Sequence, residues 1–298
     1  MNMNHIGAKI SIFAAILSFC IAPVSCTSEP VTYQGPDYIL FSEKSYDIGV
    51  ISNDEWFEIP ITATRSCDYD RNIGVEVIAE RSNAIERRHY VIESNTLTIP
   101  SGELTTSLRI RGMADNISVA DSLGIALRLV IEPENVWDAY GIESQVHLRK
   151  CCPVELDNFT GYAKLTSTWT MQYMNSDARL VYTERDATER DVIVVKDMFY
   201  DGYDVRLRFR TDDRLNPTIE LDEHVIGTTG EAFGTIYGNG KLMMATPTGY
   251  SSYYSSCENY LLLYVTMYVA DVGTVGTYVN IFEWITDDEA ERIMREGF

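Results

Sequence analysis

The amino-acid sequence predicts an all-β protein in which a β-sandwich is followed by an up-and-down barrel of eight or nine strands and a short C-terminal helix. Short runs that alternate between apolar and polar side chains recur along the chain, and turn residues separate them at intervals of about eight to twelve positions. The runs become longer after residue 153. Such a series is typical of sandwiches when the strands are short, and of closed meanders when they are long.

The first 25 residues have the three parts of a secretory signal peptide. Lys9 provides a positive charge, an apolar run follows from Ile10 to Ala22, and Pro23 ends it. The run is shorter than the roughly 20 apolar residues that a transmembrane helix needs. We therefore expect residues 1–25 to be a cleaved leader.

The segment Pro23-Val24-Ser25-Cys26 resembles the lipobox of bacterial lipoproteins. The resemblance implies that Cys26 is the lipid attachment site and carries acyl chains such as palmitate. Each buried methylene contributes about 0.8 kcal/mol, so several chains together form a stable anchor. Residues 26–36 are polar and contain Gly-Pro, which predicts a tether. The alternative is a secreted protein in which Cys26 is incidental.

The residues after this cysteine indicate a destination. Thr27 stands where known sorting rules place Asp in inner-membrane lipoproteins, so the resemblance implies the outer membrane. Glu29 resembles part of the surface-export signals of gut-type gram-negative anaerobes. We expect a lipid-anchored outer-membrane protein exposed at the cell surface.

The charge of the chain excludes some partners. It has 24 Lys and Arg residues against 44 Asp and Glu residues, for a formal net charge of −20 at pH 7. Nucleic acid phosphates would be repelled, so nucleic acid is not an expected partner. Anionic lipid headgroups would be repelled as well, which leaves membrane attachment to the acyl chains.

Four cysteines follow the proposed anchor, namely Cys67, Cys151, Cys152 and Cys257. Four cysteines allow three pairings, and the sequence does not choose among them. A bond between the adjacent Cys151 and Cys152 would be strained, which favours partners elsewhere. Their spacing does not match zinc-binding patterns, so we expect neither a metal nor another cofactor. The oligomeric state stays open.

Residues 37–153 are predicted to form the sandwich. A turn at Pro100 to Gly102 separates two of its strands, because proline presets φ and glycine suits the end of a type I turn. The strand-like runs cover residues 38–41, 46–50, 56–63, 74–79, 89–92, 96–99, 104–110, 124–131 and 145–148.

Part of this domain resembles a known module. The segments 89–92, 97–103, 108–111 and 127–131 read His-Tyr-Val-Ile, Leu-Thr-Ile-Pro-Ser-Gly-Glu, Leu-Arg-Ile-Arg and Leu-Arg-Leu-Val-Ile. Together they resemble the Calx-beta-like, immunoglobulin-type modules that open many surface lipoproteins of glycan-utilisation systems. The resemblance implies an immunoglobulin-like sandwich that presents or spaces another domain.

One segment of the sandwich has the start of a calcium-binding loop. Asp68, Asp70 and Asn72 follow the Asp-x-Asp-x-Asn spacing of an EF-hand. The glycine and the bidentate glutamate of that motif are replaced by Ile73 and Ala79. Asp and Asn also favour turns before strands, and we favour a hairpin turn over a calcium site.

Residues 154–298 are predicted to form the barrel, since a long meander usually closes to remove its exposed edges. Its first strand is expected over 161–171, with Trp169 on the inward face. This arrangement resembles a lipocalin-like barrel, although lipocalins have Gly where this chain has Ser167. Another strand is expected over 234–237. Thr286 begins a capping box, which predicts a C-terminal helix that plugs or braces the barrel.

The stretch from Gly249 to Tyr260 is rich in Tyr and Ser. Tyr offers a large contact area at a low entropic cost, and Ser adapts its hydrogen bonds, so the mixture is common at binding surfaces. The candidate ligand surface comprises Tyr250, Tyr253, Tyr254, Tyr260 and Trp169. The competing interpretation is that the tyrosines only cap the barrel mouth.

The sequence favours binding over catalysis. It has no nucleophile elbow, zinc-protease or phosphate-loop motif, and its mature histidines His89, His147 and His224 lie in or beside strand-like runs. We expect a binding or presentation protein, an accessory of glycan capture beside an outer-membrane transporter. The alternatives are a carrier of an apolar small molecule inside the barrel, and a structural or adhesin subunit.

Overall fold

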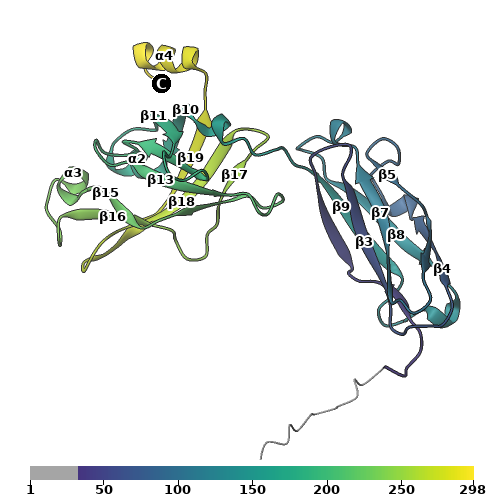
Figure 1. Ribbon diagram of the computed structural model, residues 1–298. Helices are drawn as coiled ribbons and strands as arrows, with labels where there is room; N and C mark the ends of the chain where they lie inside the picture. The colour runs from purple at the N-terminus through teal and green to yellow at the C-terminus, as the bar shows by residue number, and fades with distance from the viewer. Residues whose placement is uncertain (1–32) are drawn as a thin grey trace, which may run out of the picture.

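The computed structural model describes residues 33–298, which form two β-domains joined in sequence (Figure 1). The first is a sandwich of two sheets and the second is a closed barrel, so the predicted fold class is confirmed. The last strand of the sandwich ends at Lys150 and the first strand of the barrel begins at Gly161. Cys26 and the predicted leader lie outside the described residues.

The sandwich pairs a four-stranded sheet with a five-stranded one. The first sheet has the order β1-β3-β7-β5, and the second has the order β2-β9-β8-β4-β6. All pairs are antiparallel except β2–β9, which is parallel. The strands are β1 (Ile39–Phe41), β2 (Ser45–Val50), β3 (Trp56–Ala63), β4 (Arg71–Val77), β5 (Tyr90–Ile92), β6 (Thr96–Ile99), β7 (Thr105–Gly112), β8 (Leu123–Val130) and β9 (Glu143–Lys150).

The core of the sandwich lies between its two sheets. Ile59 and Ile61 alternate along β3 with polar or half-buried residues, and Leu108 and Ile110 do the same on β7. Single-turn 3₁₀ helices in the connections cover Ala79–Arg81, Ala114–Asn116 and Pro133–Asn135. The period-two pattern of the sequence thus gives each sheet one buried face.

The barrel is a ring of eight antiparallel strands in the order β18-β17-β14-β13-β12-β11-β10-β19, and β19 pairs again with β18 to close it. A hairpin of β15 and β16 extends from the second half of β18. The strands are β10 (Gly161–Ser167), β11 (Ala178–Arg185), β12 (Val192–Lys196), β13 (Val205–Arg210), β14 (Thr218–Leu221), β15 (His224–Thr228), β16 (Lys241–Ala245), β17 (Ser252–Ser255), β18 (Tyr260–Val269) and β19 (Gly273–Trp284).

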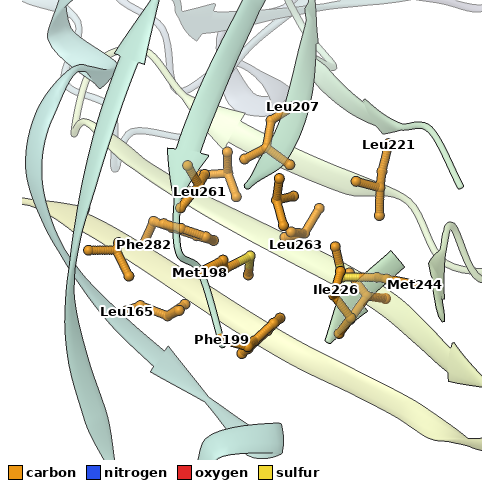
Figure 2. Close-up of a cluster of buried hydrophobic side chains, with 14 of the residues drawn as sticks. Leu165, Met198, Phe199, Leu207, Leu221, Ile226, Met244, Leu261, Leu263 and Phe282 are labelled. Atoms are coloured by element: carbon orange, nitrogen blue, oxygen red, sulfur yellow. The ribbon is translucent and has the colours of Figure 1, made fainter. Parts of the chain in front are cut away.

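Side chains fill the interior of the barrel (Figure 2). Leu165, Leu207, Leu263 and Phe282 come from four different strands, point toward one another and are fully buried. An apolar molecule carried inside would have to displace such side chains, and close-packed cores resist that change. The interior therefore offers less support for the carrier hypothesis than the sequence suggested.

The first barrel strand is shorter than predicted. It ends at Ser167, and α2 (Thr168–Tyr173) follows. The Ser167 hydroxyl accepts a hydrogen bond from the backbone N–H of Trp169 at 3.2 Å and so caps the helix. The expected strand over 161–171 is wrong beyond Ser167, because a capped turn replaces the alternation.

The predicted strand over 234–237 is also wrong. Thr228 and Glu231 form a capping box that starts α3 (Thr229–Phe233). Gly234 then ends the helix with φ of 69°, a left-handed conformation that suits glycine. The helix and the turns after it occupy the chain between β15 and β16.

The C-terminal helix α4 (Asp287–Glu296) is present as predicted and begins at its cap, Thr286. It contacts β10, and Ala290 and Ile293 are its buried residues. The helix thus braces the barrel. Among residues 33–298, no helix combines the length and the apolar character that a membrane crossing requires.

Candidate functional site

A groove of about 480 Å³ lies where the sandwich meets the barrel. The sandwich contributes Val119 and the end of β9, Arg149 and Lys150. The barrel contributes the connection from β13 to β14, residues 214–218, together with Ser251 and residues 253–257 around β17. Cys151, in the link between the domains, completes the wall. Concave sites at domain junctions are common ligand-binding sites.

Alternation along β17 gives its two tyrosines different roles. Tyr254 is only 2% exposed, packs on Phe159 and Phe209, and donates its hydroxyl hydrogen to the carbonyl of Arg210 at 3.1 Å. Burial raises the pKa of Tyr254 to about 12. Tyr253 points outward and is 41% exposed. Tyr254 thus fixes the strand, and Tyr253 presents an aromatic ring in the groove.

A disulfide bond ties one end of the groove together. Cys152 in the interdomain link bonds to Cys257 in the turn after β17. The Ser256 hydroxyl donates a hydrogen bond to the carbonyl of Cys152 at 2.8 Å. The open question of cysteine pairing is resolved by this bond, and the Tyr/Ser stretch is thereby attached to the link between the domains.

Arg214 joins the barrel side of the groove to the sandwich. Its guanidinium donates to the Glu55 carboxylate at 2.6 Å and to the Gly49 carbonyl at 3.4 Å. The hydrogen bond to Glu55 raises the pKa of Arg214. A Cβ atom at Gly49 would lie 2.8 Å from Cδ of Arg214 and 2.9 Å from Sγ of Cys151. Gly49 therefore permits the close approach of the two domains.

Cys151 is a free thiol in the groove wall. Its S–H donates to the carbonyl of Arg214 at 3.3 Å. Burial raises the pKa of Cys151, and the nearby Arg214 and Arg149 only partly oppose this effect. The thiol therefore stays protonated at neutral pH, which makes it a poor nucleophile toward the neighbouring disulfide.

The sandwich side of the groove is basic. The Lys150 ammonium donates to the carbonyl of Ala114 at 2.6 Å. The Arg149 guanidinium lies 3.6 Å from the Asp47 carboxylate. With Arg214, three cations line the groove, and no Asp or Glu is among the described residues that line it.

The predicted ligand-surface residues do not all lie in one place in the structure. Tyr253 and Tyr254 line the groove. Tyr260 lies edge-to-face against Tyr253 at a centroid distance of 6.4 Å, and Tyr250 packs on Tyr264 at 5.1 Å, just outside the lining. These contacts form two aromatic pairs, each of which includes a residue of β18.

Trp169 belongs to neither of these pairs. It is 0% exposed and lies in the barrel core against Tyr173 and Tyr278. The assignment of Trp169 to a ligand surface is wrong, because α2 turns its indole into the core. Its Nε1 has no hydrogen-bond partner within the described part of the chain.

The calcium-like segment lies in the sandwich, away from the groove lining. The Asp70 carboxylate accepts a hydrogen bond from the backbone N–H of Ser101 at 2.8 Å, and the Asn72 side chain accepts one from Thr98 at 2.9 Å. Asp68 is exposed. Residues 33–298 contain no group of three or more His, Cys, Asp or Glu side chains arranged to hold a metal ion.

Sequence reasoning missed the basic side of the groove. Arg149 and Lys150 stand directly before the Cys151-Cys152 pair at the predicted domain boundary, and this position was the only available signal. Arg214 lies in a polar turn between two strands. Only the folded chain shows that these cations meet the Tyr/Ser stretch.

The fold and groove together define a two-domain β-protein with a groove at the domain junction. Residues 139–296 match DUF4984, a domain of unknown function. Because the match spans more than half of the chain, the protein belongs to this family. The matched region includes the last strand of the sandwich, β9, as well as the barrel. No curated protein matches the sequence.

Several solved structures are similar to parts of this chain. A protein of unknown function from Bacteroides ovatus is 11% identical, with 82% of this chain and 89% of that chain covered and a TM-score of 0.36. The apo form of the Calx CBD1 domain is 18% identical, with coverages of 39% and 98% and a TM-score of 0.32. A candidate carbohydrate-binding protein from Bacteroides ovatus is 13% identical, with coverages of 81% and 67% and a TM-score of 0.31.

Proposed function

We propose that this protein is a lipid-anchored cell-surface protein that binds a saccharide in the groove between its two domains. The observation that carries the proposal is the exposed ring of Tyr253 in a groove that a disulfide bond and an interdomain ion pair hold in place. The role is binding or presentation rather than catalysis, as an accessory of glycan capture beside an outer-membrane transporter.

The chemistry of the groove suits a sugar. An aromatic face stacks on the C–H face of a pyranose ring, and Tyr253 offers that face. Ser251, Ser255 and Asn216 surround it with groups that donate and accept hydrogen bonds. Because the disulfide and Arg214 already fix the walls, binding would require little further ordering, which favours affinity.

The filled barrel interior makes an apolar carrier the less supported alternative. A structural or adhesin role remains the competing hypothesis for the groove. It predicts a protein partner and no saccharide affinity.

The saccharide site has a direct test. We expect Tyr253→Ala to weaken saccharide binding by about tenfold or more, by analogy with nucleobases, whose stacking on one aromatic side chain contributes about 1–3 kcal/mol. Affinity gel electrophoresis on a panel of polysaccharides measures the effect. Tyr182→Ala is the matched control, because Tyr182 is an exposed tyrosine on the outer face of β11. Equal retardation of both variants would contradict the proposed site.

The anchor is tested separately. We expect cells that express the wild-type protein to incorporate labelled palmitate into it, and Cys26→Ser to abolish the label and release the protein from the membrane fraction. Degradation of the wild-type protein by protease added to intact cells would support surface exposure. An unlabelled wild-type protein would contradict the lipid anchor without bearing on the groove.

A further inference from the structure

We infer that the saccharide bound in this groove is anionic and carries a carboxylate or sulfate group. This inference rests on the proposed function and names the class of its ligand. It follows from the charge of the groove, from the hydrogen-bonding capacity of its cations, and from the positions of the nearby carboxylates.

The groove differs in charge from the rest of the protein. The chain has a net charge of −20, yet Arg149, Lys150 and Arg214 line the groove and no described carboxylate residue does. A patch opposite in sign to the whole protein attracts ligands of the opposite charge and excludes like-charged ones. A neutral sugar would gain nothing from it.

Two of the three cations have unused donors. Lys150 donates one of its three N–H groups to the carbonyl of Ala114, and the other two have no partner among the described residues. The Arg149 side chain is 53% exposed, and its pairing with Asp47 is long and solvated. Such an exposed pair contributes little and yields to a better partner. Arg214, by contrast, is engaged by Glu55 and keeps the two domains together.

The nearby carboxylates are already engaged or belong to a neighbouring hollow. Asp213 accepts hydrogen bonds from the backbone N–H groups of Leu215 and Asn216 and from the Asn216 side chain. These bonds lower the pKa of Asp213 and hold its carboxylate in the turn. Asp212 lines the neighbouring hollow with Asp213, Arg210 and Glu220.

The cations and the aromatic ring stand on different domains. Arg149 and Lys150 end β9 of the sandwich, whereas Tyr253 belongs to β17 of the barrel. A ligand that stacks one sugar ring on Tyr253 and directs an acidic group toward β9 would use both walls. Charge-assisted hydrogen bonds from Arg and Lys to carboxylate or sulfate oxygens would then hold the acidic group.

Matched pairs of polymers test the charge of the ligand. Polygalacturonate is compared with its methyl ester, and dextran sulfate with dextran, by isothermal titration and affinity gels on the full mature protein. We expect the charged member of at least one pair to bind about tenfold or more tightly than its neutral partner, and to weaken as salt is raised. Which pair shows the preference separates carboxylate from sulfate recognition.

Charge-matched variants locate the preference. The double variant Arg149→Gln with Lys150→Gln is expected to bind the charged polymer no more tightly than its neutral partner. The control is Arg292→Gln with Arg295→Gln, which removes the same charge from the exposed side of α4. If both double variants lost the preference for the charged polymer equally, the polymer would be attracted non-specifically to positive charge anywhere on the protein. That result would overturn the inference.

The outcomes also separate this inference from the proposed function. Equal binding of charged and neutral partners that still depends on Tyr253 would overturn the anionic ligand and leave saccharide binding intact. Retention of none of the four polymers would count against both.

Discussion

Replacing Cys152 and Cys257 together with serine is expected to lower the free energy of unfolding of the barrel by about 4–5 kcal/mol. The disulfide closes a loop with a sequence separation of 105, which contains most of the barrel strands. A cross-link over so long a loop removes much conformational entropy from the unfolded chain. Chemical denaturation under non-reducing conditions, monitored by circular dichroism, measures the loss.

A reductant provides the internal control. It should destabilise the wild-type protein to the level of the double variant and leave the double variant unchanged. Cys67→Ser should behave as the wild type in both conditions, because Cys67 is a free thiol. If the reductant destabilised the double variant as well, the loss could not be assigned to this bond.

The same variant should also affect the groove. Without the bond, residues 253–257 would be held to the interdomain link only by hydrogen bonds such as that from Ser256 to Cys152. We expect weaker ligand binding with an intact barrel, since a loop freed from the disulfide would then have to become ordered on binding.

Trp169→Ala is expected to destabilise the barrel by about 3–5 kcal/mol, the usual loss when a fully buried tryptophan is truncated in a core. The indole packs against Tyr173 at a centroid distance of 4.2 Å, Tyr278 at 5.0 Å and Phe233 at 6.2 Å. Removing it leaves a cavity among rings that come from α2, β19 and α3. The midpoint of thermal or urea unfolding measures the effect.

Met171→Ala is the matched control, because Met171 lies two residues along the same helix and is 43% exposed. We expect its effect to stay within about 0.5 kcal/mol, as for most surface substitutions. A loss below about 1 kcal/mol for Trp169→Ala would contradict the packed arrangement of the core. A fall in saccharide affinity without a fall in stability would restore Trp169 as a ligand residue.

Period-two alternation carried most of the fold prediction. Each strand with one buried face, such as β10 with Ala163 and Leu165 inward, is visible as a local pattern. The pattern is wrong at Trp169, because the alternation predicts a strand through residues that form α2. The decisive interaction is the cap by Ser167, whose side chain also bonds to Asn280 at 2.6 Å. That partner is distant in sequence, so local alternation does not reveal it.

The groove was predictable only in part. The Tyr/Ser composition pointed to the segment that contains Tyr253, because composition reports local chemistry. The cations at Arg149 and Lys150 reach the same groove through the pairing of distant strands and through the Cys152–Cys257 bond. The sequence leaves three ways to pair all four cysteines, whereas the folded chain joins only Cys152 to Cys257 and leaves Cys67 and Cys151 as free thiols.

Because β2 pairs in parallel with β9, both strands run toward the same end of the sandwich. The chain enters the sandwich beside the connection that precedes β9, where the Asn135 side chain donates to the Asp37 carbonyl at 2.7 Å. It leaves the sandwich at the far end of β9 (Figure 1). Lys150, the last residue of β9, lines the groove. The eight residues of β9 span about 26 Å at roughly 3.3 Å per residue. The length of β9 therefore sets how far the groove lies from the point where the described chain enters the sandwich.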